Sequence, residues 1–300
     1  MQVTNIFSVS VGLFIVLLGF YVRNVGSGKI AQKHFFQLSL ALSVWMFCHG
    51  FRILLPEFLR ELALNWTLIP ILFVPHSLFQ IVRLIFRPEL KIGSTISQIH
   101  LFGFIYMIGS VFLCNAVEIK DPERFTYRPT INYHAIILYE FTYISFSCAV
   151  LVRSVFRFSG DLRIRAFLLS AGTIMALLFT IFCVWIMPLF GYFWASKSAF
   201  GFIPFFLFWA VAVLHYDTFE IRERILEGER TPILSRYSSS IMMTLYNVLD
   251  PAGYNLKLAE SKIAVTAGIL LENNYLSESL NMNVRARSKK LYDKFKHRLK

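Results

Sequence analysis

Six polar or titratable side chains stand inside otherwise apolar stretches of this sequence, and they are the residues that could do chemistry. They form three pairs at helical spacing: His49 with Arg52, His76 with Gln80, and Glu140 with Tyr143. Residues three or four positions apart lie on one face of a helix. Ionisable side chains inside a membrane are costly and usually face the interior of a helix bundle. We therefore predict that these six side chains line a pocket for a small polar or amphipathic ligand.

Other uses of the same residues stay open at this point. A proton path through a transporter or channel would use Glu140 and the two histidines, although an evident inverted repeat is absent from the sequence. An intramembrane enzyme would need His49, His76 and Glu140 to converge, with or without a metal ion. A structural ion pair of Glu140 with Arg52 or His76 would also account for them. The sequence shows no hydrolase, kinase or metal-ligand signature, so we predict no catalytic residue, no metal and no cofactor.

The elements that must position these residues are membrane-spanning helices. Hydrophobic residues make up 56% of the chain and charged residues only 16%, whereas soluble domains have about 25% charged residues. A spanning helix needs about 20 mostly apolar residues. Seven segments meet this condition: 6–23, 35–55, 64–87, 97–115, 134–157, 166–190 and 196–216. We predict an all-α membrane protein, with a seven-transmembrane domain over 1–216 followed by a small helical cytoplasmic tail.

Basic residues indicate how the chain is oriented. Loops on the cytoplasmic side of a membrane are enriched in Lys and Arg. If the N-terminus lies outside, the loops that follow the first, third and fifth spans are cytoplasmic, and these loops carry ten of the sixteen Lys and Arg residues that precede residue 217. We therefore predict an outside N-terminus and a cytoplasmic C-terminus, with the lipid bilayer as the main partner of the first domain.

The stretch Ala199–Arg230 marks the exit from the membrane, because its first half is apolar and its second half is rich in charge. Spacings of four and three residues, typical of a short coiled coil, separate Leu214, Thr218, Ile221 and Ile225. We predict a cytoplasmic signalling helix over 217–230 and a homodimer that forms along this seam.

Three segments resemble the N-terminal seven-helix region of bacterial histidine kinases. They are PHSLFQIVRLIFRP at 75–88, SGDLRIRAFLLSAG at 159–172 and FGFIPFFLFWAVAVLHYDTFEI at 200–221. The likeness covers about residues 1–225. The resemblance implies a sensory input module in the bacterial cytoplasmic membrane, which in this family is fused to varied outputs. The sequence after the seven spans resembles neither a kinase nor a cyclase, so the resemblance leaves the output open.

Residues 231–300 are expected to form a small helical output domain. We predict a helix at about 233–249 that ends at the helix-breaking residues Asp250 and Pro251. The stretch 256–300 resembles a LuxR-type helix-turn-helix, with Ile263 in the core and Asn283 as the N-cap of a basic last helix. The resemblance implies that this last helix enters the major groove of DNA. Its expected DNA contacts are Asn283, Arg285, Arg287, Ser288, Lys289, Lys290 and Lys294.

A basic amphipathic helix also suits an anionic lipid surface or a separate signalling protein. Our leading hypothesis is a non-enzymatic membrane sensor that couples a small molecule or a membrane stimulus to the tail, which acts as a membrane-tethered DNA-binding regulator. The alternatives are a sensor whose tail docks lipid or a signalling protein, and a transporter or channel.

Overall fold

A computed structural model of the chain describes residues 3–25, 30–89, 93–121, 125–214, 219 and 233–296. The chain divides into two compact units. The first unit is Met1–Ser154 with Ala166–Leu214, and the second is Val155–Arg165 with His215–Lys300. The sequence predicted a single boundary at residue 216, and it did not predict that residues 155–165 belong to the same unit as the tail. The second unit thus combines the tail with the connection between two helices of the first unit.

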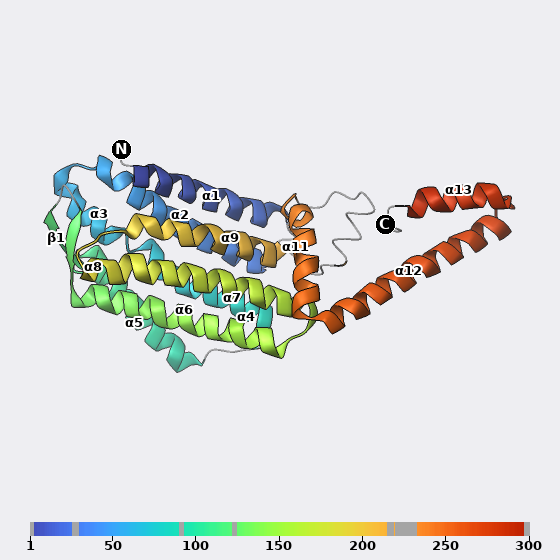
Figure 1. The fold of residues 1–300 in the computed structure, drawn as a ribbon. Helices are drawn as coiled ribbons and strands as arrows, with labels where there is room; N and C mark the ends of the chain where they lie inside the picture. Colours follow the sequence, from blue (N-terminus) through green and yellow to red (C-terminus); the bar gives the residue numbers. More distant parts are fainter. Residues whose placement is uncertain are drawn as a thin grey trace. The chain divides into compact units, whose positions relative to one another are not determined.

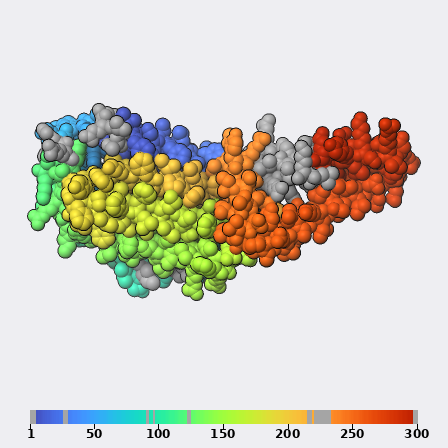
Figure 2. Space-filling model, viewed as in Figure 1, coloured from blue at the N-terminus to red at the C-terminus, as the bar shows by residue number. Residues whose placement is uncertain are grey.

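The first unit is a bundle of helices that run alongside one another (Figure 1). Its α-helices are α1 (Val3–Val25), α2 (Ile30–Phe51), α3 (Arg60–Trp66), α4 (Val74–Phe86), α5 (Ser94–Phe112), α6 (Ile131–Arg157), α7 (Gly160–Thr180), α8 (Met187–Leu189) and α9 (Ala199–Leu214). Shorter helical segments are η1 (Arg52–Leu54), η2 (Glu57–Leu59), η3 (Pro70–Phe73), the π-helix η4 (Ile181–Ile186) and η5 (Ala195–Ser198). On the face seen in Figure 2, side chains of α1, α9, α7 and α6 form a continuous surface.

The lengths of these helices agree with a membrane protein. Six helices in the described part of the chain are long and apolar enough to cross a bilayer: Asn5–Val25, Ile30–Leu54, Glu57–Phe86, Ile131–Arg157, Gly160–Leu189 and Ala195–Leu214. They coincide with six of the seven predicted spans, and the all-α membrane fold is confirmed.

The remaining predicted span, 97–115, is a shorter apolar helix, Ser97–Phe112. It ends early because Cys114 has a left-handed backbone conformation, with φ of 57°. The Asn115 N–H then donates to the Ser110 carbonyl at 2.8 Å. This geometry closes a helix by satisfying carbonyl groups of its last turn.

A two-stranded antiparallel hairpin follows α5, and the sequence did not predict it. Its strands are β1 (Val117–Asp121) and β2 (Thr126–Pro129). Asn65 on α3 holds the first strand in place. Its Oδ1 accepts from the N–H groups of Ala116 and Val117 at 3.1 and 3.0 Å, and its Nδ2 donates to the Val117 carbonyl at 3.1 Å. One buried side chain thus fixes the hairpin to the bundle.

Close packing between helices relies on a small residue and on a buried tryptophan. A Cβ atom on Gly19 of α1 would lie 2.6 Å from Cβ of Ser39 on α2, so only glycine allows this approach. Small residues at such crossings are typical of membrane helices. On α9, the fully buried Trp209 donates from Nε1 to the Leu169 carbonyl and to Thr173 Oγ1, at 3.1 and 3.2 Å. These bonds fix the position of α9 against α7.

The second unit contains the helices α11 (Ile233–Leu249), α12 (Pro251–Glu278) and α13 (Val284–Phe295). Helix α11 confirms the helix predicted at 233–249. Proline suits the first turn of a helix because its missing N–H would have no helical partner there, and Pro251 accordingly starts α12. The predicted N-cap is also confirmed, since the Asn283 side chain accepts from the Ala286 N–H at 2.9 Å.

The buried side chain of Asp250 joins the parts of the second unit. Its Oδ2 accepts from the Gly160 N–H at 2.7 Å, and its Oδ1 accepts from the Gly253 N–H at 3.0 Å. Next to it, Lys257 Nζ lies 2.8 Å from Asp161 Oδ2. These bonds attach the start of α12 to the α6–α7 connection, and we call the four residues Gly160, Asp161, Asp250 and Lys257 the clamp.

One expectation for the tail is wrong. Ile263 was predicted in the core of a helix-turn-helix, but its side chain is 68% exposed. The reason is that α12 runs without a break from Pro251 to Glu278, and neither α11 nor α13, which both contact α12, covers Ile263 in the described part of the chain. Apart from Phe219, the predicted signalling helix, 217–230, lies outside the described residues, and so do all the predicted seam residues except Leu214, which ends α9.

Candidate ligand-binding site

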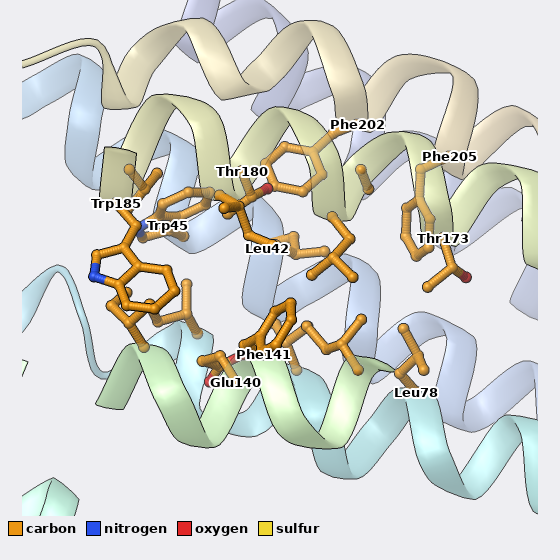
Figure 3. Close-up of a pocket in the computed structure, with 18 residues that line it drawn as sticks. Leu42, Trp45, Leu78, Glu140, Phe141, Thr173, Thr180, Trp185, Phe202 and Phe205 are labelled. Atoms are coloured by element: carbon orange, nitrogen blue, oxygen red, sulfur yellow. The ribbon is translucent and has the colours of Figure 1, made fainter. Parts of the chain in front are cut away.

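A largely apolar pocket lies inside the first unit, between helices α2, α4, α6, α7 and α9 (Figure 3). Its cavity volume is about 80 Å³. A largely apolar cavity with a polar group in its wall is the usual form of a site for a small organic molecule. The side chains labelled in Figure 3 are Leu42, Trp45, Leu78, Glu140, Phe141, Thr173, Thr180, Trp185, Phe202 and Phe205. We call this space the Glu140 pocket.

In the described part of the chain, Glu140 is the one ionisable side chain that lines this pocket. Its Oε1 atom is buried and has no hydrogen-bond partner among the described residues. The ion pairs that the sequence allowed, with Arg52 or His76, are also absent from that part of the chain. A buried polar atom without a partner costs free energy. Glu140 is therefore available to a hydroxyl, amide or amine group of a ligand in an otherwise apolar space.

His49 and Arg52 line a second, smaller pocket at the hairpin end of the bundle. His49 is 4% exposed, and neither of its ring nitrogens has a hydrogen-bond partner in the described residues. The Arg52 guanidinium lies 4.8 Å above the Phe125 ring. Tyr127 of β2 also lines this pocket, and burial raises the pKa of its phenol. We call this space the His49 pocket.

His76, Gln80 and Tyr143 belong to a third group. His76 and Gln80 approach each other to 3.5 Å, the limit for a hydrogen bond. A further member of this group, which was not predicted from the sequence, is His100 on α5. Its ring lies 5.1 Å from that of Tyr143 and 6.0 Å from that of His76. His100 Nε2 is also 3.0 Å from the Tyr139 hydroxyl. His76 is exposed and Gln80 and Tyr143 are half-buried, so this group lies at the side of the bundle.

The six predicted ligand residues therefore do not converge on one pocket. Glu140 lies in the large pocket, His49 and Arg52 in the small one, and the other three at the side. The aromatic walls of the large pocket escaped prediction because a sequence of apolar spans does not distinguish a side chain that faces a cavity from one that faces lipid. Ligand binding by these residues stays a prediction.

Comparison with known proteins identifies the bundle. The family described as the N-terminal 7TM region of histidine kinase matches residues 6–222. The chain belongs to this family. No curated protein and no solved structure matches the chain. The resemblance proposed from the sequence is thus confirmed, and residues 6–222 are a membrane sensor region of the kind found in histidine kinases.

Both pockets lie within this 7TM region, whereas α11, α12 and α13 follow its last matched residue. In α13, Arg285, Ser288, Lys289 and Lys290 are exposed, as a nucleic-acid or lipid contact would require. Lys294 instead forms an ion pair with Glu272 of α12, with 2.8 Å between Nζ and Oε2. The Asn283 oxygen is used by its capping bond. Two of the seven predicted DNA contacts therefore already have partners within the tail.

Proposed function

We propose that this protein is a membrane sensor whose stimulus is a mainly apolar small molecule bound in the Glu140 pocket. The observation that carries the proposal is the unpaired carboxyl oxygen in an apolar cavity of the 7TM region. Ligand sites are typically apolar cavities with a few polar groups that orient the ligand. The proposal assigns no catalytic step to the protein, and it places the N-terminus outside and the tail in the cytoplasm.

The signal would leave the bundle through α6 and α7. Both helices line the Glu140 pocket, α6 with Glu140 and Phe141 and α7 with Thr173 and Thr180. Both lead into residues 155–165, which belong to the same compact unit as the tail. The clamp bonds between Gly160 and Asp250 and between Asp161 and Lys257 lie in this unit. A ligand that shifts α6 against α7 would therefore change the geometry on which α12 depends.

The tail would act by docking another macromolecule. Helix α12 exposes three apolar side chains at a spacing of seven residues: Leu256, Ile263 and Leu270 are 62%, 68% and 58% exposed. A spacing of seven is the repeat by which two helices pack along each other. This feature favours a helical partner, either a separate signalling protein or a second copy of the chain. DNA binding through the exposed basic residues of α13 is the competing output.

The stimulus is tested with the purified full chain in nanodiscs of neutral phospholipid. Octanol serves as an apolar probe, and its heat of binding is measured with empty nanodiscs subtracted. Thr180→Phe fills the pocket and is expected to weaken octanol binding by about tenfold. The matched control is Leu178→Phe on the same helix, because Leu178 is 62% exposed and does not line the pocket. Octanol binding that is absent, or that both variants leave unchanged, would refute the proposal.

The transporter alternative uses the same unpaired Glu140 and needs its own assay. Reconstituted liposomes with a pH-sensitive dye inside would report proton entry. The sensor proposal expects no flux above that of empty liposomes. A flux that Glu140→Gln abolishes would instead assign the protein to the transporters.

The outputs are separated by titrating the full chain in neutral nanodiscs with duplex DNA over a salt series. Phosphate contacts give an affinity that falls steeply with salt concentration. If the tail docks a helical partner, the chain should not bind DNA in this way. A DNA affinity that falls steeply with salt concentration, and less steeply in the double variant Lys289→Ala with Lys290→Ala, would instead support the DNA-binding regulator.

A further inference from the structure

The His49 pocket collects buried nitrogen atoms that have no hydrogen-bond partner within the described residues. They are the donor Trp45 Nε1 and the two ring nitrogens of His49, of which a neutral imidazole has one donor and one acceptor. In the same part of the chain, Arg52 contacts the Phe125 ring but has no ion pair. An arginine carries its charge permanently and offers up to five N–H groups. Three neighbouring side chains of α2 and η1 thus bring N–H groups to one small cavity, and those of Trp45 and His49 have no acceptor among the described residues.

The two tyrosines of this pocket do not add donors to it. The Tyr133 hydroxyl donates to the Val184 carbonyl at 2.6 Å. The 3.2 Å contact between the Tyr127 and Tyr133 hydroxyls must therefore be donated by Tyr127, because each hydroxyl has only one proton. Neither phenol therefore donates a hydrogen bond into the pocket, and the donors that line it belong to Trp45, His49 and Arg52.

The walls contain no group that balances the charge of Arg52. The lining residues of this pocket in the described part of the chain include no Asp and no Glu. Arg52 is half-buried, and a charge that is partly removed from water without a counterion costs free energy. An anion with two acceptor oxygens would satisfy the guanidinium by a bidentate contact and would accept from His49 or Trp45 as well.

The position of the pocket indicates what the anion is attached to. Trp45 and Val184 line both the His49 pocket and the Glu140 pocket, so the two spaces adjoin. The first offers donors and a positive charge, and the second is largely apolar. A molecule with a charged end and a hydrocarbon body has this distribution of polarity.

We propose that the His49 pocket binds the carboxylate of an amphiphilic organic acid, whose hydrocarbon part occupies the Glu140 pocket. This inference rests on the proposed sensor function and specifies its ligand class. Arg52 would hold both carboxylate oxygens, and His49 would donate one further hydrogen bond.

The test compares octanoate with octanol, which differ in the charged end but have the same chain length. Binding to the full chain is measured by calorimetry in neutral nanodiscs. Arg52→Gln is expected to weaken octanoate binding by about tenfold or more, because it removes charge-assisted hydrogen bonds. The same change should leave octanol binding within a factor of about two, because the alcohol makes no contact of this kind.

Arg60 provides a matched control. Its guanidinium lies 5.3 Å from the same Phe125 ring, but Arg60 does not line the pocket. Arg60→Gln is therefore expected to change neither affinity. His49→Phe keeps the ring volume, removes the donor, and provides a second variant if Arg52→Gln is not recovered as folded protein.

The outcomes separate the two proposals. Octanoate binding that depends on Arg52 and His49 but not on Arg60 supports the inference. Octanoate and octanol that bind equally well, without dependence on Arg52, overturn it and leave the sensor function standing. If neither octanoate nor octanol binds, both the inference and the proposed sensor function are overturned.

Discussion

At the scale of single residues, buried polar atoms that lack a hydrogen-bond partner have a different role from those that have one. Glu140 and His49 have buried atoms for which the described part of the chain provides no hydrogen-bond partner, and a stable bundle tolerates this only at a cost in free energy. Asp250 is the opposite case, because its two carboxylate oxygens accept from the Gly160 and Gly253 N–H groups. The first kind of residue is available to a ligand, and the second kind fixes the structure.

The satisfied carboxylate of Asp250 predicts a dependence on pH. The Gly160 N–H, and after it the Gly253 N–H, hold the pKa of Asp250 below its usual value. A depressed pKa stabilises the folded state at any pH above the unfolded value of about 4, and this stabilisation is lost as the pH falls through the folded value. We expect the amides of Gly160 and Gly253 to lose hydrogen-exchange protection as the pH is lowered from about 5 to 3.

Two variants check this assignment. Asp250→Asn should lower that protection already at neutral pH, by about 1 kcal/mol, because an amide has one acceptor oxygen and no charge. Asp293→Asn, on the exposed surface of α13, should have no effect. Protection that is independent of pH in the unmodified chain would contradict the assigned role of Asp250.

At the scale of elements, the hairpin depends on one side chain outside it. Asn65 makes three hydrogen bonds to the backbone of Ala116 and Val117, and it is fully buried. The hairpin in turn supplies Val117 and Tyr127 to the His49 pocket. A change in α3 should therefore reach that pocket through β1, although Asn65 does not line it.

Asn65→Ala is expected to destabilise the bundle by about 2–3 kcal/mol, because it leaves buried backbone groups without partners. It should also weaken octanoate binding more than octanol binding. The control is Asn132→Ala, since Asn132 bonds to the Asn115 carbonyl and the Tyr106 hydroxyl at an exposed position. Thermal unfolding in detergent measures the first effect. Equal stability of the two variants would mean that the hairpin is held by other contacts.

At the scale of the whole molecule, the proposed coupling has a test of its own. The double variant Asp250→Asn with Lys257→Gln removes the clamp and leaves both pockets intact. It should bind octanol with unchanged affinity, because binding and transmission use different residues. In the unmodified chain octanol should change hydrogen exchange within 155–165 and 250–257, and in the double variant this response should disappear. A response that persists would place the path elsewhere, for example in the segment after α9.

The sequence was sufficient for the parts of this molecule that depend on composition and local rules. Apolar length predicted the spans, and the capping residue Asn283 predicted the start of α13. The sequence was insufficient where tertiary contacts decide which side chains are buried and which lie together. The position of Ile263 depends on whether a third helix covers it, and the separation of Glu140 from Arg52 depends on how α2 and α6 pack. His100 was missed because a lone histidine at the start of an apolar helix carries no local signal.

The clamp also has a consequence for the balance between attached and released states of the tail. The tail is linked to the bundle covalently after Leu214, so Asp250 and Gly160 belong to one chain and meet at an effective concentration on the order of millimolar. Each hydrogen-bonded pair of the clamp adds on the order of 1 kcal/mol to a contact made at such a concentration. A difference of about 1 kcal/mol changes the populations of two conformations several-fold. Under the proposed function, the small size of the clamp is what would let a small ligand act on the tail.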